Sequence, residues 1–556
     1  AAPASEPAAE AAAEPAAPEA PAETPAEAPA AEAPAVNEIK DMVSQASTAD
    51  LKAFSDNLTC EARAKLVEAI EQSISPRGEK NEVATVEMNK FDLERYTEPD
   101  RIIAALKHSK KPVRLVKGSR IIKLWKDGGV LARRQELPED FFVSAEEVMK
   151  LWDESGADYQ GRTGRKGNLM GVLPIVVISF CWLSAAHCDP EGLHLATVAT
   201  ALEREMIKYA EVHTQFDTLC DMSLPTGDFN GFTEVAVFWD WASLPQKDPK
   251  LWHPCCLKDE ELRTEEENAL VTRYHQSRSE EETESFRYAL HETMDLWYAH
   301  QCTIVYKLTS LPKGCERSRT VEVQDVHADA TEADVRELFS SVGTVQTVTM
   351  AKGRAFVVFE DEDGDTYPGE KVSDRTNRCV RLAVQLGGSS LRSQPIRVFG
   401  KGYDDSGWTT FEGVSSEQIK KVKLPYVNFK LVLDLGVAEG EETRSTHRIL
   451  KECGWNQAAQ RAWPIGPDDF EVMIETRSFT NGSDKEAVKT VFRKASTNQL
   501  GGVKHLNFEG MAAPSVEDGR RLGRCLNFCV NLEFLGLDKV GMSEKTLQAL
   551  LASLSE

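Results

Sequence analysis

Hydrophobic and polar positions follow two alternating patterns within residues 173–310. Three apolar, largely β-branched runs read as strands, because a strand covered on both faces is apolar throughout. These runs are Ile175–Phe180, Glu234–Asp240 and Cys302–Tyr306. The helical spacing between them falls at Leu195–His213 and Phe286–His300. Strands that alternate with helices predict an α/β domain with a parallel sheet and right-handed crossovers. A further strand is expected at Leu431–Leu435, so the domain comprises residues 173–310 and 400–499.

The chain before this domain changes its pattern three times. Residues 1–36 are almost only Ala, Pro and Glu, which predicts a disordered tail. Residues 37–76 have the periodicity of a helical hairpin, and residues 77–172 form a mixed α+β lead-in. In that lead-in, Pro112–Trp125 alternates like a strand or hairpin, and Ser144 is placed to cap a short helix. Farther along, residues 257–282 read as an acidic, mobile segment.

Residues 319–399 form a separate unit inserted into the α/β domain. Their pattern predicts the order βαββαβ, with alternating strands around two amphipathic helices. The first and last strands of such a sheet are antiparallel neighbours, so the two ends of the insert emerge together.

The octapeptide Lys352–Phe359, read as Lys-Gly-Arg-Ala-Phe-Val-Val-Phe, makes the insert resemble an RNA-recognition motif (RRM). Members of that family stack single-stranded RNA bases on exposed aromatic residues of the sheet. The resemblance implies RNA contacts at Lys352, Arg354, Phe356 and Val323. Glu322 occupies a first-strand position where it would repel phosphate, and acidic residues outnumber basic ones in the insert. A protein-binding RRM is therefore the competing interpretation.

The stretch Tyr403-x-x-Ser-x-Trp-Thr-x-x-Glu412 follows the insert. It resembles a pattern of Toll/interleukin-receptor (TIR) domains, with threonine where the family has cysteine. In NAD-cleaving members the glutamate that matches Glu412 is the catalytic carboxylate, so the resemblance implies NAD as a candidate substrate. Ser179 and Asp240 close two parallel strands at the edge where ligands bind in such sheets, and we take them as pocket candidates. Many TIR domains only assemble with one another, and Glu412 then has a structural role.

Two segments near the C-terminus repeat 29 residues apart. Val503-x-x-Leu-x-Phe508 and Leu532-x-x-Leu-x-Leu537 each precede an amphipathic helix. Residues 500–556 therefore resemble leucine-rich repeats, which commonly bind protein partners. Two repeats bury little apolar surface on their own, so we expect them to cap the preceding domain.

Composition narrows the function classes. The net charge of −24 argues against non-specific nucleic-acid binding, so no DNA contact is expected and RNA contact must be local. No Gly-x-x-x-x-Gly-Lys-Ser/Thr motif occurs, so the sequence does not support a P-loop NTPase. The cysteines lack the paired spacing of a metal site and predict free thiols in an intracellular protein, cytoplasmic or nuclear. The longest apolar run is interrupted by Pro174, and no membrane span is expected.

Three functions fit the sequence. The first is an intracellular adaptor that binds single-stranded RNA through the RRM and other proteins through the TIR-like and leucine-rich regions. The second is a TIR-like NAD hydrolase that uses Glu412. The third is a scaffold that binds only proteins. We favour a non-enzymatic role that requires no cofactor or metal.

Overall fold

The computed structural model describes twelve segments, all within one compact unit that spans residues 51–556. They are residues 91–154, 173–203, 234–258, 260–309, 311–312, 315–351, 353–360, 378–420, 431–435, 462–479, 484–509 and 511–554. The tail predicted for residues 1–36 and the helical hairpin predicted for residues 37–76 lie outside them.

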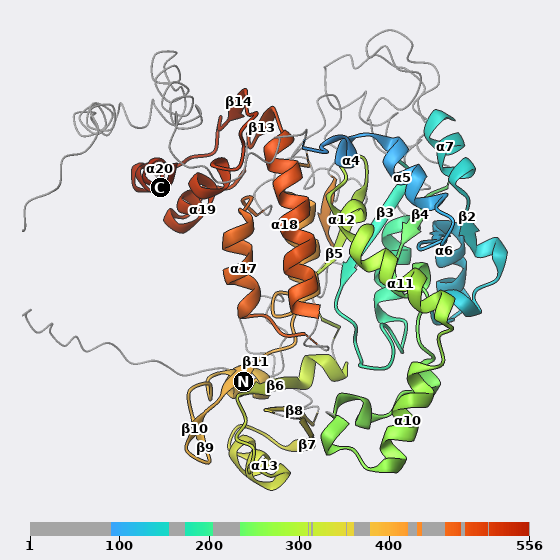
Figure 1. Ribbon diagram of the computed structural model, residues 1–556, viewed down its shortest axis with the longest axis vertical. Helices are drawn as coiled ribbons and strands as arrows, with labels where there is room; N and C mark the ends of the chain where they lie inside the picture. The colour runs from blue at the N-terminus through green and yellow to red at the C-terminus, as the bar shows by residue number, and fades with distance from the viewer. Residues whose placement is uncertain are drawn as a thin grey trace, which may run out of the picture. The chain divides into compact units, whose positions relative to one another are not determined.

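A six-stranded sheet forms the centre of the larger domain, in the order β12-β5-β3-β4-β1-β2 (Figure 1). The strands are β1 Leu115–Lys117, β2 Phe142–Val143, β3 Ile175–Phe180, β4 Ala236–Phe238, β5 Ile304–Leu308 and β12 Val432–Asp434. Strands β12, β5, β3 and β4 run parallel, and β1 and β2 continue the sheet antiparallel. The three predicted β-branched runs are thus its central strands, and the strand predicted at Leu431–Leu435 is its edge.

Helices cover both faces of this sheet, because β3 sends alternate side chains to opposite sides. Val176 and Ile178 join a core formed with α6 and residues 193–203. Ile175 and Val177 join a second core formed with α12, α15, α17 and α18. The helices of the larger domain are α4 Glu94–Thr97, α5 Pro99–Leu106, α6 Gly118–Lys126, α7 Ala145–Glu154, α9 Asp240–Ser243, α10 Glu265–His275, α11 Glu280–Glu292, α12 Met294–Ala299, α15 Gly407–Glu417, α17 Pro467–Glu475 and α18 Asp484–Gly502. Short 3₁₀ turns are η1 Arg134–Glu136, η2 Glu139–Phe141, η3 Pro249–Leu251, η4 Pro254–Leu257 and η5 Glu260–Leu262.

Three sequence predictions for this domain were wrong in part. Pro112–Trp125 is a strand only at β1, since the spacing from Ile121 to Leu124 and Trp125 matches a helical turn and forms α6. The segment predicted to be mobile contains α10, which a capping box between Thr264 and Glu267 begins.

The helix predicted over Phe286–His300 divides at Thr293 into α11 and α12, because the Thr293 backbone leaves the helical conformation. Ser144 caps α7 as predicted, since its Oγ accepts a hydrogen bond from the Glu147 backbone at 3.1 Å. Residues 204–213 of another predicted helix lie outside the described part of the chain.

The insert contains a four-stranded antiparallel sheet in the order β11-β6-β8-β7, as expected for βαββαβ. Its elements are η6 Glu316–Arg319, β6 Thr320–Gln324, α13 Glu332–Ser340, β7 Val345–Ala351, β8 Arg354–Phe359, α14 Arg378–Val384, the hairpin β9 Ser390–Leu391 and β10 Gln394–Pro395, and β11 Arg397–Phe399. Strand β6 begins the sheet and lies beside β11, which ends it. Both connections to the larger domain therefore leave from the same end of the insert's sheet, where β6 begins and β11 ends.

The C-terminal segment pairs β13 His505–Asn507 in parallel with β14 Phe534–Gly536. Helices α19 Val516–Leu526 and α20 Glu544–Leu554 follow these two strands and pack against each other. The strand–helix alternation agrees with the repeat pattern, whereas the leucine-rich-repeat identity stays a prediction.

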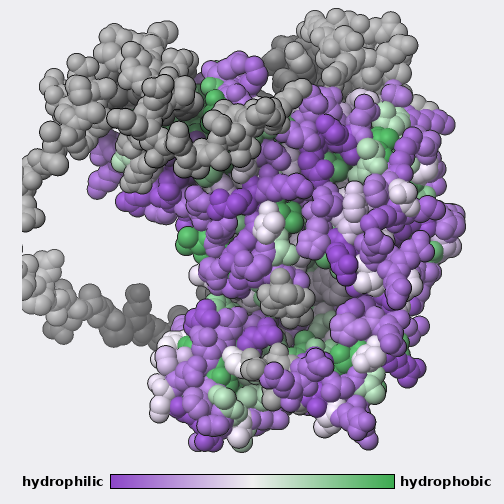
Figure 2. Space-filling model, in the orientation of Figure 1, coloured by the Kyte–Doolittle hydropathy of each residue, from purple (hydrophilic) through white to green (hydrophobic). Residues whose placement is uncertain are grey.

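The surface of the described residues is mainly hydrophilic, with small and scattered hydrophobic patches on the face in Figure 2. Large exposed apolar side chains among these residues are Val130, Leu270, Val384, Val472, Val530 and Phe534. No helix of the described segments is long and apolar enough to cross a membrane.

Candidate functional site

Strand pairing in the insert determines which side chains share the sheet face opposite the helices. Residues paired across adjacent strands lie on the same face. Gln324 of β6 pairs with Arg397 on one side and with Arg354 on the other. In the next row, Glu322 pairs with Phe399 and Phe356. The open face thus has one basic and polar row and one row with two aromatic rings.

Glu322 lies at the centre of this face and is fully buried. Its carboxylate forms an ion pair with Lys401, which follows β11, and accepts a hydrogen bond from Gln324 Nε2 at 2.9 Å. Arg354 Nη1 lies 3.8 Å from the same carboxylate. Burial lowers the pKa of Lys401, and the charge of Glu322 opposes this shift. The carboxylate expected to repel phosphate is therefore neutralised by a neighbouring cation.

Phe356 is covered instead of exposed. The Lys401 ammonium lies 5.1 Å from the centre of the Phe356 ring, and the Arg354 guanidinium lies 5.9 Å from it. Only 7% of Phe356 is exposed. A base cannot stack on this ring until Lys401 moves aside.

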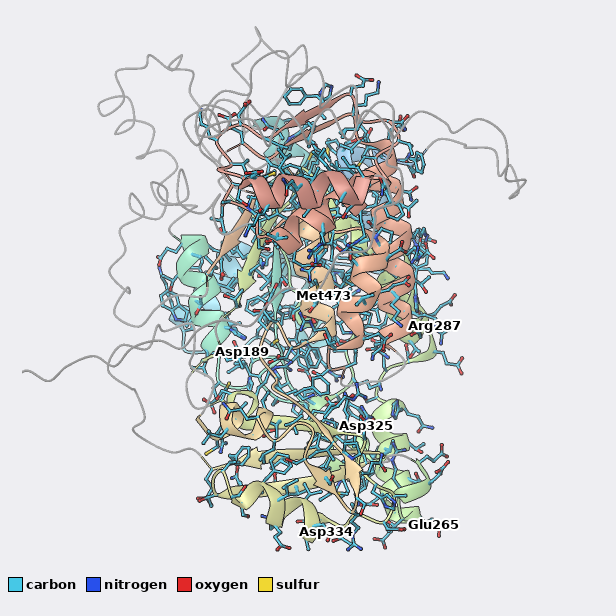
Figure 3. The ribbon with its side chains drawn as sticks, turned by 90° about the vertical axis from the view of Figure 1, so that its left-hand side faces the viewer. Asp189, Glu265, Arg287, Asp325, Asp334 and Met473 are labelled. Atoms are coloured by element: carbon cyan, nitrogen blue, oxygen red, sulfur yellow. The ribbon has the colours of Figure 1, made fainter. Side chains whose placement is uncertain are left out.

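The accessible cations of the open face lie along its polar row. Arg354 exposes 25% of its side chain and Arg397 exposes 53%. Arg397 forms an ion pair with Asp325, which Figure 3 labels, and its guanidinium lies 5.7 Å from the centre of the Phe399 ring. The guanidinium groups of Arg354 and Arg397 can pair with phosphate and stack on a base.

The candidate RNA-binding residues from the sequence have different placements. Arg354 and Phe356 share the open face. Val323 is fully buried in the core on the helix side, because it alternates with Glu322, and this removes it from the RNA-contacting side chains. Lys352 and residues 361–377 lie outside the described residues.

Sequence reasoning missed Arg397, Phe399 and Lys401. The alternating pattern of the last strand, β11, carried the information for the first two. Alternation from the buried Val398 places Arg397 and Phe399 on the open face. No local pattern indicated Lys401, because its partner Glu322 lies at the other end of the insert.

The second candidate site lies in the larger domain, where α15 meets the end of β3. Ser179 Oγ donates a hydrogen bond to Glu412 Oε2 at 2.6 Å, and Tyr403 Oη lies 2.6 Å from Ser179 Oγ. Ser179 is fully buried and Glu412 is 7% exposed. Burial raises the pKa of Glu412 well above its usual range, and the hydrogen bond from Ser179 opposes the shift only in part.

Asp240 acts on this site through its charge. Its carboxylate accepts hydrogen bonds from Trp182 Nε1 at 2.9 Å and from the Trp241 backbone at 2.6 Å. Burial raises the pKa of Asp240 to about 6, and its negative charge helps to raise the pKa of Glu412. The fold therefore joins Ser179 directly to Glu412, with Asp240 nearby, and it favours the protonated form of Glu412.

Trp408 lies on α15 one turn before Glu412. Its ring packs against the domain core, 6.0 Å from the centre of the Phe411 ring, and its Nε1 donates to Asp484 at 3.0 Å. Thr409, which stands where TIR domains have cysteine, donates a hydrogen bond to the Tyr403 carbonyl. The Trp408 contacts hold α15 against the domain core. The Thr409 hydrogen bond holds it against the loop that precedes it.

The described segments contain no group of three or more His, Cys, Asp or Glu residues placed to hold a metal ion. No disulfide joins the cysteines of these segments.

Comparison with known protein families identifies part of the insert. The family model for the RNA recognition motif matches residues 321–366. This range covers β6, α13, β7 and β8, so it includes the strands that carry Glu322, Arg354 and Phe356. No curated protein matches the chain.

Proposed function

We propose that this protein binds single-stranded RNA through the open sheet face of its RRM, within a larger adaptor. The row formed by Arg397, Gln324 and Arg354 carries the proposal, because it offers two guanidinium groups and an amide on adjacent strands. The family match to residues 321–366 supports it. Phe399 lies beside this row and supplies an aromatic surface for stacking.

The net charge of −24 limits how tightly RNA binds. Two local arginines neutralise few phosphates, and the rest of the surface repels the strand at long range. We therefore expect weak binding that falls steeply with salt. A DNA strand of the same sequence lacks the 2′-hydroxyl groups that RNA-binding proteins use to discriminate RNA, and we expect it to bind less tightly.

Fluorescence anisotropy with a labelled single-stranded RNA at low salt tests the proposal. We expect the combined Arg354→Ala and Arg397→Ala variant to lose at least tenfold in affinity. Arg392→Ala is a matched control, because Arg392 pairs with Asp334 at the start of α13, away from the open face. Absence of RNA binding by the unaltered chain would assign the RRM to protein binding instead.

The adaptor role includes protein partners for the TIR-like and leucine-rich regions. The parallel strands and packed helices after residue 502 agree with a repeat that caps the larger domain. Affinity purification with and without residues 503–556, followed by mass spectrometry, tests this part. Partners lost with the deletion support the role, and an unchanged set contradicts it.

NAD cleavage is the second candidate function, favoured by the 2.6 Å hydrogen bond between Ser179 and Glu412. A carboxylate beside the ribose would stabilise positive charge as nicotinamide leaves, but Glu412 must first lose its proton. Activity is therefore expected to rise with pH. Release of nicotinamide from NAD, lost in Glu412→Gln, would support this function. Release that persists in that variant would exclude Glu412 from it.

A further inference from the structure

Two cations outside the RRM lie together without a carboxylate partner. Lys247 follows the loop after α9, and Arg278 lies between α10 and α11. No ion pair joins either side chain to an acidic residue in the described part of the chain, although most exposed cations of those segments have such a partner. Both side chains are half-buried. Unpaired, half-buried cations in a strongly acidic protein mark a candidate anion site.

Neighbouring groups fix the positions of these cations. Lys247 Nζ donates a hydrogen bond to His275 Nδ1 at 2.7 Å and lies 5.0 Å from the centre of the Tyr274 ring. Arg278 Nη1 donates to the Pro245 carbonyl at 3.2 Å, and its guanidinium lies 4.1 Å from the Phe286 ring centre. We call Lys247, Tyr274, His275 and Arg278 the Lys247 cluster. Its members come from two separate stretches of chain, Lys247 and residues 274–278, so the fold assembles it.

The electrostatics of the Lys247 cluster also favour an anionic ligand. Burial, with a further contribution from the positive charge of Arg278, lowers the pKa of Lys247 to about 8. Glu282 is the carboxylate that acts on Arg278, but its side chain already accepts the Ser279 backbone N–H at the start of α11. An incoming anion would relieve the repulsion between Lys247 and Arg278.

The turn η4 lies between the Lys247 cluster and β7, the outer strand of the RRM sheet. Cys256 of η4 is close enough to Lys247 to influence its pKa. The same turn, η4, lies beside β7 on one side and beside α10 on the other. Glu265, labelled in Figure 3, marks the start of α10. A strand of RNA that leaves the sheet across β7 therefore meets η4 and then the cluster.

We propose that Lys247 and Arg278 bind phosphates of an RNA strand that continues from the RRM sheet across β7 onto the larger domain. This inference rests on the RNA binding proposed above and extends it to residues outside the RRM. Arg278 offers a planar fork of donors, Lys247 offers a compact charge, and Tyr274 offers a ring. A site divided between insert and host requires a longer RNA than the sheet alone can hold.

Two labelled RNAs test the proposal on the full chain. One is a tetranucleotide, roughly the length that an RRM sheet can stack, and the other is a dodecanucleotide. We expect the combined Lys247→Ala and Arg278→Ala variant to bind the dodecanucleotide less tightly while its tetranucleotide affinity stays unchanged. For two lost phosphate contacts, the slope of log affinity against log salt should decrease by about 1.4.

Controls separate this loss from general effects. Lys504→Ala combined with Arg520→Ala removes the same charge from the C-terminal segment, where both cations pair with glutamates, and should change neither affinity. Lys247→Arg keeps the charge and should retain the dodecanucleotide affinity. Equal dodecanucleotide binding by the double alanine variant and the unaltered chain would overturn the extension alone. Failure of the unaltered chain to bind either RNA would overturn the RNA function and the extension together.

Discussion

Ser179 and Glu412 are 233 positions apart in the chain, yet their side chains share a hydrogen bond of 2.6 Å. The contact joins the end of β3 to the middle of α15, across the point at which the RRM is inserted. It also places a carboxyl group where water does not solvate it. The consequences of that burial can be measured whether or not the site performs chemistry.

The unfolding free energy should therefore depend on Glu412 above about pH 5. The unfolded carboxyl is ionised there, whereas the folded one keeps its proton because its pKa is raised. The folded state then binds more protons, so stability falls as pH rises, by up to about 1.4 kcal/mol per pH unit. Glu412→Gln mimics the protonated acid and should remove this component.

Urea denaturation of the unaltered chain and of Glu412→Gln between pH 5 and 8 measures the difference. Other titrating groups cancel in that difference. Glu544→Gln changes an exposed carboxyl on α20 and should follow the unaltered chain at every pH. Parallel stability curves for Glu412→Gln and the unaltered chain would contradict the prediction.

Removing one partner of the Glu322–Lys401 pair should destabilise the RRM strongly. Glu322→Leu leaves the buried Lys401 ammonium without its carboxylate, at a cost of about 3–5 kcal/mol. Lys401→Met leaves Glu322 with only the longer contact to Arg354 and the Gln324 hydrogen bond, and should also destabilise the fold. The double variant buries two apolar side chains and should recover most of this loss. Hydrogen exchange of β6 and β8 amides reports the RRM specifically, and additive effects of the two substitutions would refute coupling.

Two glycines of α15 should respond to alanine in opposite directions. A Cβ at Gly407 would lie 1.9 Å from the Phe479 ring, so Gly407→Ala should cost about 1–3 kcal/mol through overpacking. At Gly413 the nearest atom would be 3.6 Å away. Gly413→Ala should therefore gain up to about 1 kcal/mol from helix propensity. The urea denaturation midpoints of Gly407→Ala and Gly413→Ala measure these two effects. Similar midpoints would mean that Phe479 moves aside.

Affinity for the dodecanucleotide should fall between pH 7 and 9. Lys247 is charged below its pKa of about 8 and neutral above it, so its phosphate contact weakens as pH rises. Around it, burial places the pKa of His275 below this window, that of Tyr274 is about 12, and Arg278 keeps its charge.

Binding titrations across this window measure the effect. Lys247→Arg should make affinity independent of pH, and Cys256→Ser controls for the neighbouring thiol. A pH dependence that survives Lys247→Arg would show that another group is responsible.

The sequence revealed the strands and the insert because both depend on local patterns. Ile175–Phe180 has no polar residue except Ser179, so burial on both faces followed directly. The break of one predicted helix at Thr293 was not predictable, because Phe286, Leu290, Met294 and Trp297 keep helical spacing across it.

The sites were only partly predictable. Ser179 and Glu412 were chosen from strand order and a ten-residue pattern, and the fold brings them together. The cover on Phe356 was missed, because it depends on how Lys401 returns across the sheet to Glu322. The Lys247 cluster also comes from stretches that no single motif spans. The spacing of residues along the chain does not encode contacts between distant segments.

The adjacency of β6 and β11 has a consequence for the order of folding. Strand β12 pairs with β5 from the other side of the insert, so the large sheet closes only after the insert has been synthesised. Since domains generally fold as units, N-terminal first, the RRM is complete before β12 arrives. Its joined ends then remove most of the loop that separates β5 from β12, which lowers the closure cost by roughly 1 kcal/mol. The insert thus assists the assembly of the domain that it interrupts, and its unfolding would weaken the large sheet as well.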